Sequence, residues 1–351
     1  MKGVLTLENI RLTIDGQTVE VAKGTTVLEA AQAAGIYIPT LCYDPDLEPY
    51  GGCRLCVVEI ENMRGMPTAC TTPATEGMVV HTETSAVNDV RRTVVELLIS
   101  DHPMDCLTCA KNQRCDLQKI AAYLGITERR YSRIDKALQV DTSNPFFKLD
   151  RNYCILCGKC VRTCDEVSMV NAIEIVARGY PSHVSPFGDK PITQSNCISC
   201  GECLVRCPTG ALVPTERHLP EEHEVKSVCP YCGVGCGIVL GTRSGSLVSL
   251  RGDRENPVNG GRLCVKGRFG IVDFVNHSSR LRTPLIKKNG EFVESSWEEA
   301  LDLVASKLAK YRGNQFAAIA SAKCPNEDNY VFQKFTRTVM GTNNIDHCAR
   351  L

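Results

Sequence analysis

Alternating hydrophobic and polar positions near the N-terminus predict two short strands followed by a helix. Apolar residues alternate with polar ones in Ile10–Ile14 and in Thr18–Val21, and Asp15-Gly16 between them is typical of a hairpin turn. The segment 25–35 begins with two threonines, continues through an alanine-rich run and ends in glycine, as a capped helix does. A hairpin followed by one packed helix predicts the start of a β-grasp fold.

The last third of the chain has a different pattern. Ile238–Leu240 and Leu247–Leu250 lie between glycines and predict short antiparallel strands. Apolar residues recur at helical spacing over Trp297–Leu308, Phe316–Ala320 has the composition of a buried strand, and a second helix is expected over Asn329–Met340. These elements predict the opening unit of a larger α/β domain, because one strand and its helices cannot bury both faces of a sheet.

Composition favours several small domains over one large apolar core. The chain has 351 residues, of which 43 % are hydrophobic, but only one is tryptophan. The 40 lysines and arginines balance the 40 acidic residues, so no global charge favours nucleic acid. No apolar stretch approaches the ~18 residues of a membrane span, and the N-terminus has no secretory or twin-arginine pattern. We therefore expect a cytoplasmic protein that does not insert into a membrane directly.

The 21 cysteines are the strongest chemical signal. Nineteen of them, with one histidine, fall into five groups of four at spacings typical of iron–sulfur ligands. A disulfide framework fits poorly, because the count is odd and a cytosol keeps thiols reduced. Structural zinc sites usually combine one C-x2-C pair with a distant second pair, whereas cysteines here crowd repeatedly at short spacing. Cys324 and Cys348 have no partners at ligand spacing and are expected to be ordinary buried thiols.

Two of the groups lie within the first 120 residues. The first has the pattern C-x10-C-x2-C-x13-C and comprises Cys42, Cys53, Cys56 and Cys70. The glycines directly before Cys53 permit close backbone approach to a cluster. A zinc site built from the same four cysteines is the alternative. The second has the pattern H-x3-C-x2-C-x5-C and comprises His102, Cys106, Cys109 and Cys115. A histidine near a helix end is often a surface residue, but this one precedes a C-x2-C pair that lacks a fourth ligand.

The first group differs from the C-x4-C-x2-C spacing of plant ferredoxins. It resembles the N-terminal domain shared by the large subunit of NADH:quinone oxidoreductase, [FeFe] hydrogenases and NAD-linked formate dehydrogenases. In these families the domain binds a [2Fe–2S] cluster, and the next element binds a [4Fe–4S] cluster through one histidine. The resemblance implies the same clusters here, with His102 as a ligand, and imidazole suits iron.

The third and fourth groups form an internal repeat of C-x2-C-x2-C-x3-C, the second copy followed by Pro208 and the first by Asp165 instead of proline. The repeat resembles the bacterial two-cluster ferredoxin, in which the fourth cysteine of each run ligates the other cluster. The resemblance implies one [4Fe–4S] cluster bound by Cys154, Cys157, Cys160 and Cys207. It implies a second one bound by Cys197, Cys200, Cys203 and Cys164.

The fifth group combines a C-x2-C-x3-C run with a distant cysteine and comprises Cys229, Cys232, Cys236 and Cys264. It resembles the first domain of molybdenum or tungsten bis-pyranopterin oxidoreductases, particularly formate dehydrogenases. The resemblance implies a [4Fe–4S] cluster beside the pterin, with Lys266 between the two, holding a polar pterin group and easing electron passage. The alternative for Lys266 is a solvated surface lysine, because lysine is mostly exposed.

Together these patterns predict an α+β multidomain chain. The expected domains are a [2Fe–2S] β-grasp domain at 1–95, a histidine-ligated [4Fe–4S] domain at 96–144, a two-cluster [4Fe–4S] ferredoxin domain at 145–220, a molybdopterin oxidoreductase [4Fe–4S] domain at 221–283 and the incomplete start of its α/β domain at 284–351.

The resemblance implies the N-terminal portion of a formate dehydrogenase or CO2 reductase. Electrons from a Mo or W bis-pyranopterin guanine dinucleotide site would pass through one [2Fe–2S] and four [4Fe–4S] clusters to a flavin-bearing partner that reduces NAD(P). A small [2Fe–2S] subunit and ferredoxin are further candidate partners. In formate dehydrogenases a segment resembling His347–Leu351 is followed by selenocysteine or cysteine, which binds the metal, and then histidine. We therefore expect the catalytic residue beyond Leu351, at a UGA codon read as a stop, and no formate oxidation by the 351-residue chain alone. A fragment or a natural short subunit is the alternative.

Two other functions share these domains. The large subunit of NADH:quinone oxidoreductase transfers electrons only, and its molybdopterin-type domain is degenerate. The [FeFe] hydrogenases share the four N-terminal clusters, but next carry a cysteine-rich active-site domain unlike the segment at Cys229–Cys236. The ferredoxin repeat and the intact region around Lys266 favour formate dehydrogenase over the electron-transfer subunit, and the Cys229–Cys236 segment with Cys264 favours it over the hydrogenases.

Overall fold

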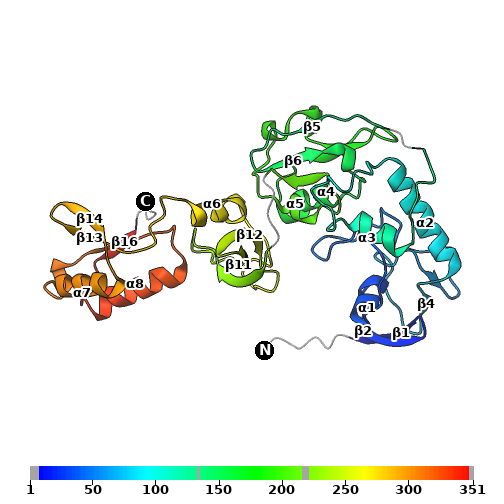
Figure 1. Ribbon diagram of the computed structural model, residues 1–351. Coiled ribbons are helices and arrows are strands. Elements are labelled where there is room, and N and C mark those ends of the chain that lie inside the picture. Colours follow the sequence, from blue (N-terminus) through cyan, green and yellow to red (C-terminus); the bar gives the residue numbers. More distant parts are fainter. Residues whose placement is uncertain (1–7, 133–134, 216–220, 348–351) are drawn as a thin grey trace. The chain divides into compact units, whose positions relative to one another are not determined.

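A computed structural model describes residues 8–132, 135–215 and 221–347. The chain divides into two compact units, Met1–Arg217 and His218–Leu351, which are described separately below. Both units combine short helices with small sheets (Figure 1), as expected of an α+β chain.

The first unit opens with a mixed sheet in the strand order β2-β1-β4-β3. Its strands are β1 (Asn9–Ile14), β2 (Gln17–Ala22), β3 (Glu59–Ile60) and β4 (Val79–His81). Strand β1 pairs with β2 antiparallel and with β4 parallel. Between β1 and β2, Asp15 and Gly16 have φ of 48° and 83°, the left-handed pair that a tight hairpin turn requires. The predicted hairpin is therefore confirmed.

Helix α1 (Val27–Ala33) covers this sheet. The Thr26 side chain accepts from the Glu29 backbone N–H, and the Glu29 carboxylate accepts from the Thr26 backbone N–H, forming a capping box. The helix places Val27 and Leu28, both fully buried, in one core with strand residues such as Leu12. The predicted capped helix is confirmed.

Two further helices follow, α2 (Ser85–Ser100) and α3 (Asp116–Tyr123). Val95 of α2 and Ile120 of α3 share a core with Leu41 and Leu55, which come from the loops of the first cysteine group. The loops around the first two groups are thus held against the same pair of helices.

The rest of the first unit contains short elements only. A three-stranded sheet has the order β5-β6-β9, and β7 pairs with β8. The elements are β5 (Val140–Asp141), β6 (Phe147–Asp150), α4 (Lys159–Arg162), β7 (Glu174–Val176), β8 (His183–Ser185), α5 (Glu202–Arg206) and β9 (Leu212–Pro214).

The second unit begins with an antiparallel sheet in the order β10-β11-β12. Strands β11 and β12 confirm the predicted strand pair. The elements of this unit are β10 (His223–Val228), β11 (Gly237–Arg243), β12 (Ser246–Gly252), α6 (Ile271–Asn276), β13 (Leu285–Lys288), β14 (Glu291–Glu294), α7 (Trp297–Leu308), β15 (Ala318–Ala320), α8 (Asn326–Thr338) and β16 (Ile345–His347). Helix α7 has the predicted bounds, whereas α8 begins at Asn326 rather than Asn329 and ends at Thr338 rather than Met340.

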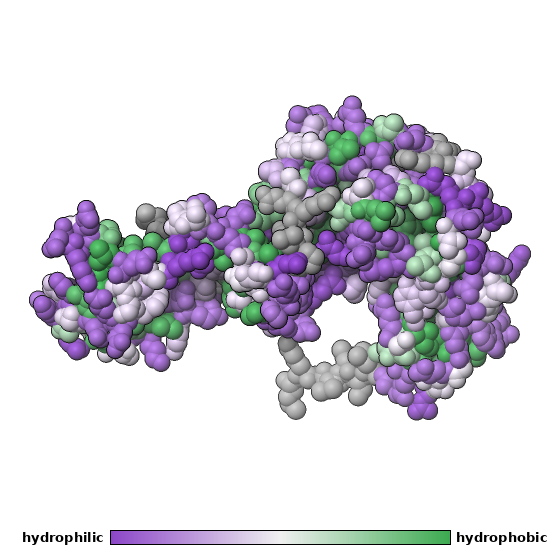
Figure 2. Space-filling view, in the orientation of Figure 1, coloured by the Kyte–Doolittle hydropathy of each residue, from purple (hydrophilic) through white to green (hydrophobic). Residues whose placement is uncertain are grey.

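The expectation of a buried strand at Phe316–Ala320 is wrong for the described structure. Within β15, Ile319 is 82 % exposed, and the apolar residues Trp297 and Leu301 of α7 are also exposed. The physical reason is that β15 pairs only with β16 in the part of the chain that the structure describes, so its sheet has two strands and little cover. On the face shown in Figure 2, hydrophobic residues appear in patches among mostly hydrophilic ones.

Across the three described ranges, no helix combines the length and the apolar character needed to cross a membrane.

The α1 core provides a test of the fold. We expect Leu28→Ala to lower the free energy of unfolding by about 2 to 5 kcal/mol, because the side chain is fully buried and leaves a cavity. Gln32→Ala on the exposed side of the same helix is the control and should change it by less than about 0.5 kcal/mol. Urea unfolding of the complete chain, followed by circular dichroism, measures both; equal effects would contradict this packing.

Candidate iron–sulfur sites

The first cysteine group comes together in the loops beside the β-grasp sheet. Cys42, Cys56 and Cys70 are almost fully buried. Thiol hydrogen bonds join Cys42 to Cys53 and Cys56 to Cys70. The Cys53 backbone N–H also donates to the Cys42 sulfur at 3.4 Å. The structure therefore gathers all four predicted residues of this group.

The pKa values of two hydrogen-bonded thiols in this group, Cys42 and Cys53, shift in opposite directions. The hydrogen bond from the Cys42 thiol and, to a smaller extent, backbone N–H groups outweigh burial and lower the pKa of Cys53 to about 5. The same hydrogen bond raises the pKa of Cys42, and burial raises it more. The geometry thus favours thiolate at one member of the pair, and thiolate is the form that binds metal.

The second group lies between α2 and α3. His102 is buried, and its ring stands edge-on to the Tyr153 ring with centroids 5.5 Å apart. Cys115 is the N-cap residue of α3, and its pKa is raised by burial and by the nearby Cys109. Cys106 and Cys109 lie in one tight turn, in which the Cys109 N–H donates to the Cys106 carbonyl. Cys109 is thus close to Cys106 through this hydrogen bond and to Cys115 through its charge. That His102 is the fourth ligand of this group stays a prediction.

The two ferredoxin-like repeats share an unusual backbone. Leu156 and Ser199 stand two residues after the first cysteine of each run and have φ of 53° and 55°. Gly158 and Gly201, two residues later, have φ of 71° and 72° and directly precede α4 and α5. Non-glycine residues rarely adopt positive φ, and such strain clusters at functional sites. In each repeat this bend lets a backbone N–H donate to the sulfur of the first cysteine at 3.4 Å.

Each cysteine run of the repeat contributes its last member to the other's cavity. One cavity is lined by Leu149, Val184, Leu212 and the four cysteines Cys154, Cys157, Cys160 and Cys207. Another is lined by Phe147, Ile173, Ile192 and the four cysteines Cys164, Cys197, Cys200 and Cys203. These are the two ligand sets that the sequence predicts, each surrounded by apolar side chains.

Burial raises the pKa of the thiols in both cavities. The pKa of Cys154 is raised to about 11 and that of Cys157 to about 12, in each case mainly by burial and further by the charge of Cys207. The pKa of Cys203 is raised as well, by burial and by the neighbouring cysteines. Gathered thiolates repel one another in an apolar site, so the arrangement suits positively charged iron, which holds cysteine as thiolate.

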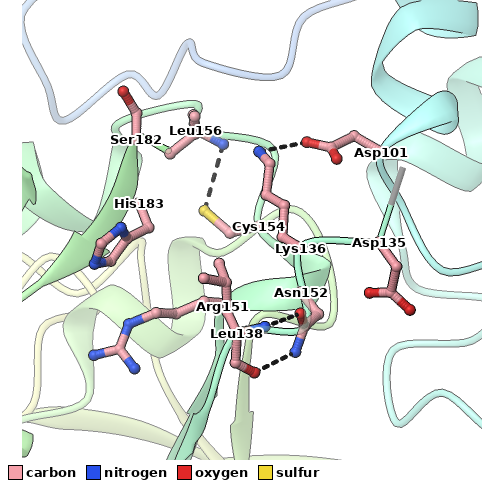
Figure 3. A pocket seen from close by; sticks show the side chains of 10 residues that line it. All are labelled: Asp101, Asp135, Lys136, Leu138, Arg151, Asn152, Cys154, Leu156, Ser182 and His183. Carbon is pink, nitrogen blue, oxygen red and sulfur yellow. Dashed lines mark hydrogen bonds and ion pairs between the residues drawn. The ribbon is translucent and has the colours of Figure 1, made fainter. Parts of the chain in front are cut away.

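The Cys154 side of the first cavity borders a polar pocket (Figure 3). Lys136 forms an ion pair with Asp101 at 2.5 Å, and its ammonium also lies 4.6 Å from the centroid of the Tyr180 ring. Figure 3 shows the Leu156 N–H bonded to the Cys154 sulfur beside this pair. A polar surface therefore comes close to the sulfur of one predicted ligand.

The fifth group lies in the second unit. Cys229 is buried, and its N–H donates to the Cys236 carbonyl at 2.9 Å. Burial raises the pKa of Cys236, and the charges of the other three members raise it further, so all four lie within electrostatic range. Cys264 is exposed, as is Lys266, which begins a π-helical turn two residues later. The structure thus brings the cysteines together but leaves the role of Lys266 a prediction.

Two arginines, the half-buried Arg162 and the buried Arg206, join the loops of the first cysteine group to the ferredoxin-like repeat. The Arg162 guanidinium, between Cys160 and Cys164, donates to the Cys42 carbonyl at 2.5 Å and lies over the Tyr50 ring at 5.1 Å. The Arg206 side chain is only 3 % exposed and pairs with Glu202 at 2.5 Å, Asp46 at 2.7 Å and Asp44 at 3.5 Å.

Tyr153 and Gly210 join the ferredoxin-like region to the second group. The Tyr153 hydroxyl donates to Asp105 at 2.6 Å, while its ring contacts His102. A Cβ at Gly210 would lie 2.7 Å from the Cys109 sulfur and 3.5 Å from the Tyr153 ring. Sequence reasoning missed Arg162, Arg206, Tyr153 and Gly210, and the only available signal was their position inside or beside the cysteine runs.

Within residues 8–132, 135–215 and 221–347, no three His, Cys, Asp or Glu side chains converge as they would around a single metal ion. Cys324 is half-buried, and Cys348 lies outside the described residues.

Five family models match the chain in succession. They are the 2Fe-2S iron-sulfur cluster binding domain at residues 8–85, the NADH-ubiquinone oxidoreductase-G iron-sulfur binding region at 91–130, the 4Fe-4S dicluster domain at 153–211, the molybdopterin oxidoreductase Fe4S4 domain at 222–277 and molybdopterin oxidoreductase at 280–351. This order confirms the predicted succession of fold types.

Curated relatives match almost the whole chain. An NADH-quinone oxidoreductase subunit of Rhizobium meliloti is 38 % identical over 97 % of this chain, and the alpha subunit of the NADPH-Fe(3+) oxidoreductase of Geobacter sulfurreducens is 37 % identical over 97 %. A protein of Staphylococcus aureus named "Putative formate dehydrogenase" is 30 % identical over 98 %. The chain spans about 40 % of the length of these relatives.

A solved structure also matches. A chain from the crystal structure of NAD+-reducing [NiFe]-hydrogenase in the H2-reduced state has a TM-score of 0.56 and 34 % identity. The match covers 59 % of this chain and 87 % of the hydrogenase chain.

Gly210 tests the geometry of the second group. We expect Gly210→Ala to lower cluster occupancy at the His102–Cys115 group, because the added Cβ displaces the Cys109 sulfur. Iron analysis and low-temperature EPR of the reduced chain should show about four fewer iron atoms and the loss of one [4Fe–4S] signal. The [2Fe–2S] signal of the same sample is the internal control. Full iron content with unchanged signals would contradict the proposed contact.

Proposed function

We propose that the chain, whose successive domains match those of iron–sulfur oxidoreductases with molybdopterin-type domains, forms the electron-carrying N-terminal part of a formate dehydrogenase. The main support for this proposal is the succession of five gathered cysteine groups, the last of which lies in the segment that matches the molybdopterin oxidoreductase Fe4S4 domain. A cytoplasmic location, which agrees with reduced cysteine chemistry, is part of the proposal.

The cysteine groups are the proposed ligands of one [2Fe–2S] and four [4Fe–4S] clusters, which accept and release single electrons. The residues present fit these clusters, because each ferredoxin-like cavity offers four sulfurs within an apolar lining. Backbone N–H groups donate to Cys42, Cys154 and Cys197, and such hydrogen bonds tune cluster potentials. The protein orients and tunes the clusters while they supply the redox chemistry.

Formate is the proposed substrate on two grounds. The fifth group and Lys266 have the pattern of Mo or W bis-pyranopterin formate dehydrogenases, and one relative carries that name. We assign Lys266 to the pterin side of the fifth cluster, where its exposed ammonium could contact a polar pterin group. The remaining members of the complex would be a flavin-bearing NAD(P)-reducing subunit and, as further candidates, a small [2Fe–2S] subunit and ferredoxin.

The second candidate is an electron-transfer subunit without formate chemistry. It is favoured by the relatives named as NADH-quinone and NADPH-Fe(3+) oxidoreductases, which are more similar to this chain than the formate-dehydrogenase-named relative. The first of these aligns over 348 residues, so the ferredoxin repeat does not separate the two functions.

The crossed ligand sets of the repeat can be tested with paired substitutions. Cys154→Ser combined with Cys207→Ser should remove one [4Fe–4S] cluster, about four iron atoms, because both residues line the same cavity. Cys154→Ser combined with Cys164→Ser is the matched control and should remove two clusters, about eight iron atoms. Iron analysis of the purified chain measures both, and the reverse result would contradict the crossed assignment.

The catalytic proposal is tested on the complete enzyme purified with its natural partners. It should contain Mo or W with pterin and reduce a viologen dye with formate. A complete enzyme free of Mo, W and pterin would support the electron-transfer candidate instead.

A further inference from the structure

Arg91 is a buried charged residue with no role in the proposed cluster ligation or electron transfer. It lies on α2, outside every cysteine group, and its side chain is fully buried. Its Nε donates to the Leu55 carbonyl at 3.1 Å and its Nη2 donates to the Val57 carbonyl at 3.0 Å. These two residues stand on either side of Cys56, so one guanidinium forms hydrogen bonds with the backbone on both sides of that cysteine.

Burying a guanidinium away from water is costly unless its charge and its N–H groups are satisfied. The nearest carboxylate is Glu83, 3.5 Å from Nη1, but the Glu83 side chain is 51 % exposed and therefore partly screened by water. The Tyr123 hydroxyl donates to Glu83, and Asp15 acts on Arg91 at longer range. Much of the positive charge is thus left facing the loop that carries Cys56.

Each carbonyl that Arg91 binds affects the N–H group of the peptide to which it belongs. The Leu55 carbonyl shares its peptide with the Cys56 N–H. The Val57 carbonyl shares its peptide with the Val58 N–H, which donates to the Pro67 carbonyl at 3.1 Å, so only the Cys56 N–H enters the argument. A carbonyl that accepts a charge-assisted hydrogen bond makes the N–H of the same peptide a stronger donor. The positive charge of Arg91 and a stronger Cys56 N–H donor near the sulfurs both stabilise the additional electron of a reduced cluster.

We propose that Arg91 is a positioning residue that fixes the Cys53–Cys56 loop and raises the reduction potential of the [2Fe–2S] cluster. The inference rests on the proposed assignment of Cys42, Cys53, Cys56 and Cys70 as cluster ligands. Because α2 leads directly into the His102 region, the same residue also ties the first two cysteine groups to one helix.

The test is a potentiometric titration of the complete iron–sulfur chain, with the reduced [2Fe–2S] cluster observed by EPR. Arg91→Met removes the charge and should shift the midpoint potential downward. Arg91→Lys keeps the charge but loses the paired geometry and should give a smaller downward shift. Glu83→Gln removes the opposing carboxylate and should shift the potential upward. Arg92→Gln, an exposed neighbour on the same helix, is the control and should leave the potential unchanged.

The downward shift in Arg91→Met and the upward shift in Glu83→Gln indicate an electrostatic role. A merely structural role would lower cluster occupancy and leave the midpoint potential of the remaining clusters unchanged. Should Arg91→Met fail to bind the cluster, Arg91→Lys and Glu83→Gln still decide the matter. Unchanged potentials in both of those variants would overturn the proposal. Absence of a [2Fe–2S] signal from the unaltered chain would instead overturn the ligand assignment itself.

Discussion

The structure depends on gathering cysteine sulfurs into buried sites from backbone that has little regular secondary structure. Helices α4 and α5, which carry ferredoxin-like cysteines, have only four and five residues. Such short helices are not stable alone, so the conformation of these loops depends on what their sulfurs bind. Positive φ at Leu156 and Ser199 agrees with this view, since strained backbone persists only where its surroundings enforce it.

Arginine side chains supply the second constraint. Arg91 and Arg162 both donate to backbone carbonyls of the [2Fe–2S] loops, while Arg206 binds acidic side chains from those loops. The Arg206–Glu202 pair is buried, and removing one member of such a pair costs about 3 to 5 kcal/mol. These arginine contacts hold the cysteine groups of the first unit at fixed separations, which is what electron transfer between clusters requires.

Local sequence patterns were sufficient to predict the hairpin and helix α1, because each depends on nearby residues, and the spacing of the cysteine runs was sufficient to select the residues that gather. The crossed sets at Cys164 and Cys207 were accessible through resemblance, since spacing alone does not say which cavity a fourth cysteine enters. The arginine contacts were not accessible, because Arg91 reaches residues 36 and 34 positions away and nothing local distinguishes it from Arg92. The buried-strand prediction at Phe316–Ala320 failed because apolar composition does not reveal how many strands flank it.

Short-range spacing therefore selects the ligand residues, and long-range contacts set their surroundings. On this view the five cysteine groups bind iron–sulfur clusters rather than single metal ions. Mössbauer spectroscopy of the 57Fe-labelled, anaerobically purified chain, combined with metal analysis, tests this most directly. The prediction is about 18 iron atoms per chain, two in one [2Fe–2S] cluster and the rest in four [4Fe–4S] clusters. Stoichiometric zinc bound by these cysteines in place of iron, with no [4Fe–4S] spectrum, would contradict it.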